Sequence, residues 1–281
     1  GEDTTLDYDG ADEGWALPVV ERFPAGEVKV VVSDEGSRLN LNLAPPAALA
    51  RLPGMEPEAL DAVLALRKHW LEVPEEVRAV ERLAGRWPDL DKLVTTFGPV
   101  NPFASSEGLA ALLEARGADE REVRETVFLV DELCQKPEAA QPESLEALRR
   151  QIPGLPESVW DRLKDDLVLD GTINVNLAPA EVLSALWAGL GLGAESRQRL
   201  LTARQGGIFR TTGVLWQILQ DEAAAKALRP WLTVASQVFR LDVAAKSGGA
   251  QVALRVLVRR SWDEPGGRAR FAVLSWAEVG Q

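Results

Sequence analysis

The stretch GEVKVVVS at residues 26–33 decides the fold, because it has a β-strand pattern with no strand partner near it in the sequence. β-Branched residues dominate it, and the turn residues DEGS at 34–37 close it. Strand patterns return only at the far end of the chain, in alternating runs at residues 237–245, 251–260 and 269–279. We predict that the early strand joins these three runs in one antiparallel sheet that is split in the sequence.

The three closing runs read as a meander joined by tight turns. The segments KSGG (246–249) and DEPGG (263–267) are rich in residues that tolerate positive φ or preset a bend. In the middle run the apolar side chains from Val252 to Val258 point one way, whereas Arg255 and Arg259 point the other way. This alternation predicts a sheet with one solvated face, the one that carries the arginines.

Between residues 39 and 235 the apolar spacing becomes helical, and proline and glycine punctuate it. The sequence therefore predicts an α+β protein in which a small antiparallel sheet carries a large all-α insertion. We expect a flexible, acidic lead-in at 1–14, a discontinuous β domain at 15–38 plus 236–281, and two helical subdomains at 39–136 and 137–235, with a flexible joint at 135–142. The helices are predicted at 58–70, 107–116, 120–134, 144–151 and 196–203.

Composition excludes several classes of protein. The net charge is −12 and the basic residues form no run, which disfavours nucleic acid as a partner. Cys134 is the single cysteine, so no disulfide can form within the chain, and we predict that it is a small buried hydrophobe. The longest apolar stretch, at 182–192, is shorter than the roughly 20 residues that span a bilayer. The chain opens with Gly1 instead of methionine, which indicates a removed N-terminal segment.

The sequence lacks the parts of an enzyme. The one histidine, His69, and the one tyrosine, Tyr8, have no evident catalytic partner, and Tyr8 falls in the predicted lead-in. There is no phosphate-binding glycine loop, metal-ligand spacing or nucleophile elbow. The nine tryptophans are too dispersed for a carbohydrate platform. We assign Trp160, Trp187, Trp216 and Trp231 to the core, and Trp262 and Trp276 to strands where a partner surface is an option.

A short motif occurs twice in the insertion, as LNLNLAP at 39–45 and INVNLAP at 173–179. After each copy comes a helical pattern, a glycine-bearing turn and a second helical pattern. Asparagine amides can bond backbone groups where an extended segment turns into a helix, and proline suits a first helical turn. We predict that the motif residues serve as hinges and helix caps: Asn40, Asn42, Pro45, Asn174, Asn176 and Pro179.

The repeated unit resembles helix-hairpin-helix (SAM-like) modules, some of which bind DNA phosphates through hairpin amides, a helix N-terminus and nearby cations. A DNA-binding or DNA-uptake protein is therefore the alternative function. In this chain carboxylates lie at both hairpins, including Glu56 and Glu195, where a phosphate needs cations. The residues that this alternative implies are Gly191, Gly193, Arg197, Arg199 and Arg204.

The wider arrangement resembles the GspK family of minor pseudopilins from type II secretion systems. Three features carry the resemblance: VSDEGSRLNLN (32–42) after the first strand, INVNLAPAEVL (173–183) after a helical stretch, and the closing β-hairpins. Members of this family have a pilin-like sheet interrupted by a large helical domain. A hydrophobic N-terminal helix anchors them in the inner membrane, with the soluble domain in the periplasm, and Gly1 fits a truncation after such a helix.

The resemblance implies a structural subunit at the tip of a type II pseudopilus or related type IV filament, which promotes filament assembly and protein export. Its partners would be other minor pseudopilins and the secretion machinery. The chain departs from the family pattern in two places. Leu43 and Leu177 stand where the family often has a threonine that caps the helix. Residues 130–133, VDEL, contain only two acidic residues where relatives often have a tryptophan-containing acidic stretch linked to calcium binding. We therefore expect no cofactor; the family resemblance leaves calcium as the one alternative, although the expected acidic stretch is not evident. A pilus-tip adhesin is a third reading.

Overall fold

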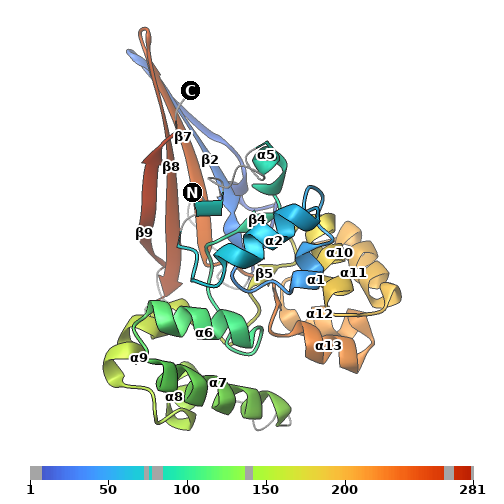
Figure 1. Cartoon of the computed structure of the whole chain (residues 1–281). Helices are drawn as coiled ribbons and strands as arrows, with labels where there is room; N and C mark the ends of the chain where they lie inside the picture. The colour runs from blue at the N-terminus through green and yellow to red at the C-terminus, as the bar shows by residue number, and fades with distance from the viewer. Residues whose placement is uncertain (1–7, 73–75, 78–84, 137–141, 263–268, 280–281) are drawn as a thin grey trace.

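The computed structural model describes residues 8–72, 76–77, 85–136, 142–262 and 269–279, without the side chain of Trp262. The predicted turn at 263–267, most of the predicted joint at 135–142 and the first half of the predicted lead-in lie outside these residues. Figure 1 shows the arrangement: a tall sheet stands at one side, and the helices gather at one end of it and against one face.

One antiparallel sheet combines strands from the early and the late part of the chain. Its strand order is β1-β2-β7-β8-β9, and β2 pairs with β7 so that Val28 lies opposite Ala245 and Val32 opposite Leu241. The predicted split sheet is therefore confirmed. The sequence analysis missed β1, which forms a hairpin with β2. The strands are β1 (Val19–Phe23), β2 (Gly26–Asp34), β7 (Val238–Ser247), β8 (Ala250–Trp262) and β9 (Ala269–Glu278).

The prediction of which face of the sheet is solvated was wrong. The face with the arginines meets the helical insertion, where Arg259 contacts Asp166 and Arg240 contacts Asp91. The opposite face, which we call the open face, is apolar, and its side chains are half-buried or exposed. An arginine-bearing face looks solvated in a sequence because its acidic partners lie far away along the chain. The open face comprises Val28, Val30, Val32, Leu241, Val243, Val252, Leu254, Val256, Val258, Phe271, Val273 and Trp276.

The insertion is mostly helical but not all-α, which corrects the prediction. Two short parallel strand pairs lie inside it, β3 (Leu39–Asn40) with β4 (Val94–Thr95) and β5 (Ile173–Asn174) with β6 (Leu232–Thr233). Each pair is too short to show a strand period. The helices of four or more residues are α1 (Pro46–Leu49), α2 (Pro57–Leu66), α5 (Trp87–Leu90), α6 (Ser106–Ala115), α7 (Glu120–Gln135), α8 (Leu145–Gln151), α9 (Glu157–Leu163), α10 (Ala180–Gly189), α11 (Ala194–Gly206), α12 (Thr212–Leu219) and α13 (Glu222–Leu228).

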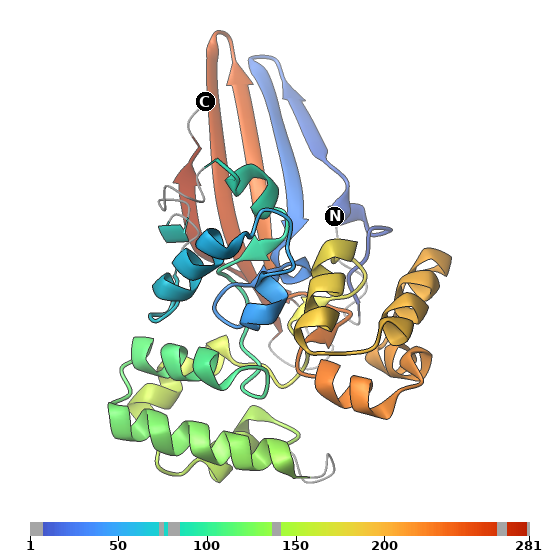
Figure 2. The same cartoon turned by 45° about the vertical axis from the view of Figure 1, so that its right-hand side comes forward.

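The helices form groups that differ from the predicted subdomains. In both views α8 and α9 lie beside α6 and α7, so the predicted boundary between 136 and 137 falls inside this group (Figures 1 and 2). Helices α1, α2 and α5 surround the β3–β4 pair, and α10 to α13 surround the β5–β6 pair. Short 3-10 turns complete the description at η1 (Gly14–Ala16), η2 (Glu35–Ser37) and η4 (Lys164–Asp166).

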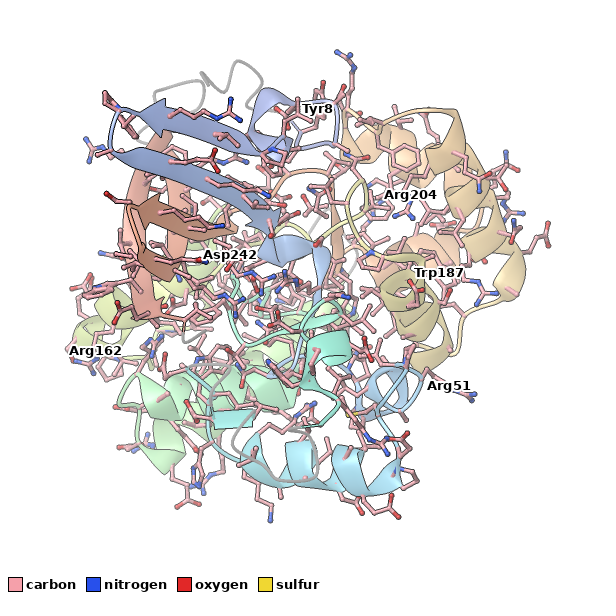
Figure 3. The ribbon with its side chains drawn as sticks, turned by 90° about the horizontal axis from the view of Figure 1, so that it is seen from above. Tyr8, Arg51, Arg162, Trp187, Arg204 and Asp242 are labelled. Atoms are coloured by element: carbon pink, nitrogen blue, oxygen red, sulfur yellow. The ribbon has the colours of Figure 1, made fainter. Side chains whose placement is uncertain are left out.

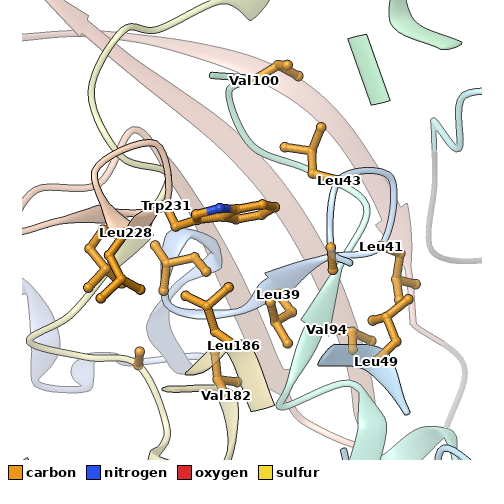
Figure 4. Packing of buried hydrophobic residues seen from close by; sticks show 14 of the residues in the cluster. Leu39, Leu41, Leu43, Leu49, Val94, Val100, Val182, Leu186, Leu228 and Trp231 are labelled. Atoms are coloured by element: carbon orange, nitrogen blue, oxygen red, sulfur yellow. The ribbon is translucent and has the colours of Figure 1, made fainter. Parts of the chain in front are cut away.

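The main hydrophobic core lies in the insertion and not on the sheet. The two motif copies share it, and Figure 4 shows Leu39 of the first copy near Leu186 of the second, with Leu41 beside Leu49 and Val94. Helices α1 and α10 approach closely, because a Cβ added at Gly189 would lie 2.5 Å from the Cβ of Ala48. The strands of the large sheet contribute none of the residues of this cluster.

The second half of the predicted lead-in is part of the fold. Tyr8 is 6% exposed and Asp9 is fully buried, which corrects the expectation for residues 8–14. Figure 3 shows Tyr8 between the first strands and the helices of the second copy. Tyr8 and Asp9 lie in a polar segment without a regular spacing of apolar residues, so the sequence pattern did not reveal their burial. In the part of the chain that the structure describes, no helix has the length and apolar character needed to cross a bilayer.

We predict that Gly189→Ala lowers the free energy of unfolding by about 1–3 kcal/mol, because the new methyl group overlaps Ala48. Helix propensity alone would raise it by up to about 1 kcal/mol. Gly206→Ala is the matched control, since nothing lies within 4 Å of its added Cβ. Urea denaturation measures both variants. Equal effects of the two substitutions would show that α1 and α10 are not in close contact.

Candidate functional site

In the first motif copy, asparagine side chains form hydrogen bonds with backbone groups, some of them in distant segments of the chain. Asn40 Oδ1 accepts a hydrogen bond from the Asn42 N–H at 2.9 Å. The Asn42 amide bridges to a distant segment: it donates to the Leu71 carbonyl at 3.0 Å and accepts from the Leu71 N–H at 2.8 Å. It also donates to the Thr96 carbonyl after β4. The side chain thus joins three segments that are far apart in the sequence.

The second copy repeats this geometry almost contact for contact. Asn174 Oδ1 accepts from the Asn176 N–H at 3.0 Å, and the Asn176 amide exchanges two hydrogen bonds of 2.9 Å with the backbone of Phe209. Phe209 therefore takes the place that Leu71 has in the first copy. The second copy has an additional contact, because both asparagine amides also donate to the Asp9 carbonyl at 3.2 Å.

The predicted capping role of the asparagines was wrong. Helix α1 follows Pro45 and helix α10 follows Pro179, and neither N-cap position makes a side-chain hydrogen bond. The asparagines lie three or more residues before these helices, so their amides reach the backbone of other segments instead. The prolines stand at the N-cap position itself, one place before the predicted first turn.

An arginine supports each motif from the following helical segment. Arg67 donates to the Ala44 carbonyl at 2.6 Å, and Arg204 donates to the Val175 and Ala178 carbonyls. Burial lowers the pKa of each guanidinium group below the ordinary value for arginine. Figure 3 shows Arg204 among the helices of the second copy. These arginines satisfy carbonyl groups that precede α1 and α10.

This geometry gives the DNA alternative no support. Arg204 is committed to backbone carbonyls, and Arg199 donates to the Leu219 carbonyl and pairs with Glu195. Arg197 is half-buried. Gly191 has a φ of +69° in an exposed turn, and Gly193 is the N-cap of α11. The structure therefore does not gather these residues into an exposed cationic surface, which a phosphate backbone requires.

A buried polar junction joins the second copy to the large sheet, and the sequence analysis missed it. We define the junction as Asp9, Asp34, Asn174, Ser236 and Arg260. Asp34 ends β2, Ser236 precedes β7, and Arg260 lies near the end of β8. No pairwise spacing in the sequence links these residues. The only sequence signal was the turn segment DEGS, which begins at Asp34.

Hydrogen bonds connect every member of the junction. Ser236 Oγ contacts Asp34 Oδ2 at 2.7 Å and receives a bond from Asn174 Nδ2 at 3.0 Å. Asp9 Oδ2 accepts from the Ser236 N–H at 2.6 Å and pairs with Arg260 at 2.5 Å. Arg260 also donates to the Ser236 carbonyl at 2.7 Å. The guanidinium of Arg260 thus pairs with Asp9, and Ser236 links Asp9 to Asp34.

Burial dominates the acid–base properties of the junction. It raises the pKa of Asp34 to about 7, and the nearby Asp9 and Glu35 carboxylates raise it further against the hydrogen bonds from Ser236 and Gly36. Burial also raises the pKa of Asp9, although Arg260 opposes that shift. The Asp34 carboxyl therefore holds a proton in a substantial fraction of molecules near neutral pH, because its pKa is about 7.

Other predicted residues show no sign of catalysis. His69 is exposed beyond the end of α2, which stops at Leu66 and not at residue 70 as predicted. Cys134 is half-buried, and burial raises the pKa of its thiol, which disfavours the reactive thiolate. Trp160, Trp187 and Trp231 are buried, and Trp216 packs partly buried against the core. Among the described residues, no three His, Cys, Asp or Glu side chains are grouped to hold a metal ion.

Residues 173–235 match the family model for protein K of the type II secretion system. We call these residues the protein K segment, after the family that they resemble. It runs from the second motif through α10 to α13 and ends at the Ser236 junction. The predicted resemblance to the GspK family is thereby confirmed over this segment, whereas the helix-hairpin-helix character of the repeats stays a prediction.

Two further comparisons accompany the protein K match. Among solved structures, the chain is similar to one in the crystal structure of the GspK-GspI-GspJ complex from the type 2 secretion system of enterotoxigenic Escherichia coli. That similarity has 16% sequence identity and a TM-score of 0.42, and it covers 98% of this chain and 88% of the other. Comparison with curated proteins found no match.

We predict that Asp34→Asn raises the free energy of unfolding at pH 8 by an amount on the order of 2–4 kcal/mol. The folded-state pKa of Asp34, about 7, lies above its unfolded value. The wild-type carboxyl therefore loses stabilisation as the pH rises from about 4 to 7, whereas the neutral amide does not titrate. The difference between the two proteins should be small near pH 4, grow with pH and level off at about pH 8. Urea denaturation across this range measures it.

Asp61→Asn, at an exposed position on α2, is the control for the loss of one negative charge. It should leave the pH dependence of stability unchanged. An Asp34→Asn effect of the same size at pH 4 and pH 8 would show that the Asp34 carboxyl does not carry a raised pKa.

We predict that millimolar calcium leaves the melting temperature unchanged relative to EDTA. Calcium takes about six to eight oxygen ligands, and the described residues hold no acidic cluster of that kind. Differential scanning fluorimetry in the two buffers tests this. A rise in melting temperature that saturates with calcium concentration would overturn the expectation that the protein needs no cofactor.

Proposed function

We propose that this protein is a minor pseudopilin of a type II secretion pseudopilus or a related type IV filament. Its role is to promote filament assembly and protein export from a position at the filament tip. The protein K segment supports this role. The observation that carries the proposal is the open face, an apolar side of a split sheet that no described element covers along its middle.

The open face needs a covering element. Burying one Val, Leu or Phe side chain completely contributes about 1.5–3 kcal/mol, so a continuous apolar face of this extent strongly favours a partner. The chain reaches this face near its described start, because the Trp15 ring packs edge-on against Phe239 at 5.1 Å between centroids. A helix that precedes residue 8 would continue along the open face from this point. We propose that such a helix covers it.

The same helix accounts for the proposed location. An apolar helix that extends beyond the sheet would anchor the protein in the inner membrane and hold the described domain in the periplasm. Other minor pseudopilins, each with an anchoring helix of its own, are the proposed partners in a hetero-oligomeric tip complex. In that arrangement helices pack together in the filament axis, while the sheets and the insertion face outward.

The placement of the insertion supports a terminal position. Residues 39–235 enter and leave the sheet at the ends of β2 and β7 that lie away from the hairpin tips, and the insertion spreads from that end of the sheet (Figure 2). A further subunit stacked on this end would collide with it. The proposed role is assembly and not catalysis, and it requires no cofactor, since the junction and the motifs use their polar groups on one another.

We predict that deletion of the gene abolishes export of the type II secretion substrates of its host, and that a plasmid copy restores export. A plasmid copy with the double substitution Val243→Glu and Val256→Glu should fail to restore it, because two carboxylates on the open face prevent helix packing. Secreted substrate in the culture medium is the readout, and immunoblotting of the variant checks its abundance.

Val214→Glu is the matched control, because Val214 is 44% exposed on α12, away from the sheet. It should restore export fully. Normal export in the deletion strain would remove the proposed function. Full complementation by the double variant would remove the role of the open face. Salt-sensitive binding of duplex DNA in a gel shift would favour the DNA alternative instead.

A further inference from the structure

The outer edge of β9 presents unpaired backbone groups. The described residues place β9 at an end of the strand order, and Figure 1 shows it on the outer side of the sheet. The Val279 N–H donates to the Ala253 carbonyl, which sets the alternation of the ladder. Ala277 and Ser275 therefore bond β8, whereas the N–H and C=O groups of Trp276 and Glu278 point outward. A β-bulge at Leu274 separates this half of the strand from its start.

The two edge strands of the sheet, β1 and β9, differ in how well their sequences prevent pairing with a strand of another chain. At the opposite edge, β1 is short, carries Glu21 and Arg22, and lies between Pro18 and Pro24. Proline and charge are the usual devices that keep an edge strand from pairing with another chain. The stretch from Phe271 to Ala277 in β9 has neither, and Trp276 is 70% exposed. Only the β9 edge is therefore chemically suited to strand addition.

A cavity of about 270 Å³ opens under this edge, on the face opposite the open face. We call it the edge pocket. It reaches β9 at Ser275 and Ala277, and Arg240, Arg255 and Asp91 form part of its charged wall. Arg240 is 9% exposed, and its Nη1 donates to Asp91 at 2.9 Å. Its buried Nε makes no hydrogen bond within the described residues, and the Asp242 and Glu35 carboxylates lie 3.4 Å and 3.6 Å from it as ion-pair partners.

These features fit one kind of occupant. A strand added to β9 places alternate side chains on the two faces of the sheet. A side chain opposite Ser275 or Ala277 would point toward the edge pocket, where the Arg240 Nε–H can donate a hydrogen bond to an acceptor. A side chain opposite Trp276 would extend the apolar open face. The fitting segment is thus extended, with an apolar residue next to an Asp, Asn, Glu or Gln residue.

We infer that the β9 edge and the edge pocket form a docking site for an extended segment of a sister pseudopilin, which pairs with Trp276 and Glu278 and inserts an acceptor side chain toward Arg240. This inference rests on the proposed function, because it assigns the partner's contact. It differs from helix packing on the open face, since it uses backbone hydrogen bonds at the sheet edge. It gives the subunit a second, lateral contact that can form without the anchoring helix.

The test mixes the purified domain with the purified soluble domains of the sister minor pseudopilins encoded beside it. Calorimetry measures the dissociation constant, and hydrogen exchange measures protection of the Trp276 and Glu278 amides. We expect protection of both amides on binding. Trp276→Pro should weaken binding at least about tenfold more than Trp276→Ala does, because only proline removes the outward N–H while the ladder to β8 stays intact.

Ser275→Trp tests the edge pocket separately, because a large side chain at this position fills the cavity and should also weaken binding at least about tenfold. Phe128→Lys is the control, since Phe128 is 61% exposed on α7, away from the sheet. It should bind normally. Circular dichroism and thermal melts confirm that each variant is folded before its binding is measured.

The outcomes separate the inference from the proposed function. Binding of a sister subunit with unprotected β9 amides and normal affinity of the Trp276→Pro and Ser275→Trp variants would overturn the inference and leave the proposed function in place. Self-association of this chain that Trp276→Pro abolishes would overturn it in favour of a second copy at the edge. Failure of every sister subunit to bind would count against both.

Discussion

The structure depends on a buried charge that cannot be left unpaired. Arg260 is 2% exposed at the end of the longest strand, and Asp9 is its fully buried partner. An isolated buried guanidinium or carboxylate is strongly unfavourable, and removing one partner of such a pair costs about 3–5 kcal/mol. Their meeting brings residue 9 to β8, and Ser236 and Asp34 complete the contact with the ends of β7 and β2. The junction thus fixes where the insertion leaves the sheet.

The helical insertion and the large sheet therefore contribute differently to the structure. The insertion contains the main core, in which the two motif copies pack through α1 and α10. The sheet contributes hydrogen-bonded strands and an arginine-bearing face that ion pairs attach to the insertion. Its apolar side adds little to the stability of the isolated domain, because those side chains still contact solvent. A sheet of this kind is anchored through its polar face and remains available through its apolar one.

The sequence predicted what periodicity encodes and missed what long-range polar contacts encode. The early strand at 26–33 and the closing meander follow from alternation, and α6, α7 and α8 lie close to their predicted bounds. The asparagine motif was found as a repeat, but its contacts with Leu71 and Phe209 have no signal in the sequence. The junction was missed for the same reason. The solvated face was misassigned because Asp91 and Asp166, which neutralise it, belong to the insertion.

The two motif copies attach to the sheet by different means, although their internal geometry is the same. The first copy reaches the sheet through ion pairs: Glu35 accepts a hydrogen bond from Thr95 next to Arg240, which in turn binds Asp91. The second copy reaches it through neutral amides, since Asn174 and Asn176 both contact Asp9. The ion pairs of both attachments are largely buried, so salt screens them only weakly. The two attachments therefore differ in chemistry and not in exposure: the first copy uses buried ion pairs, whereas the protein K segment, which contains the second copy, adds neutral amide contacts to the Asp9–Arg260 pair.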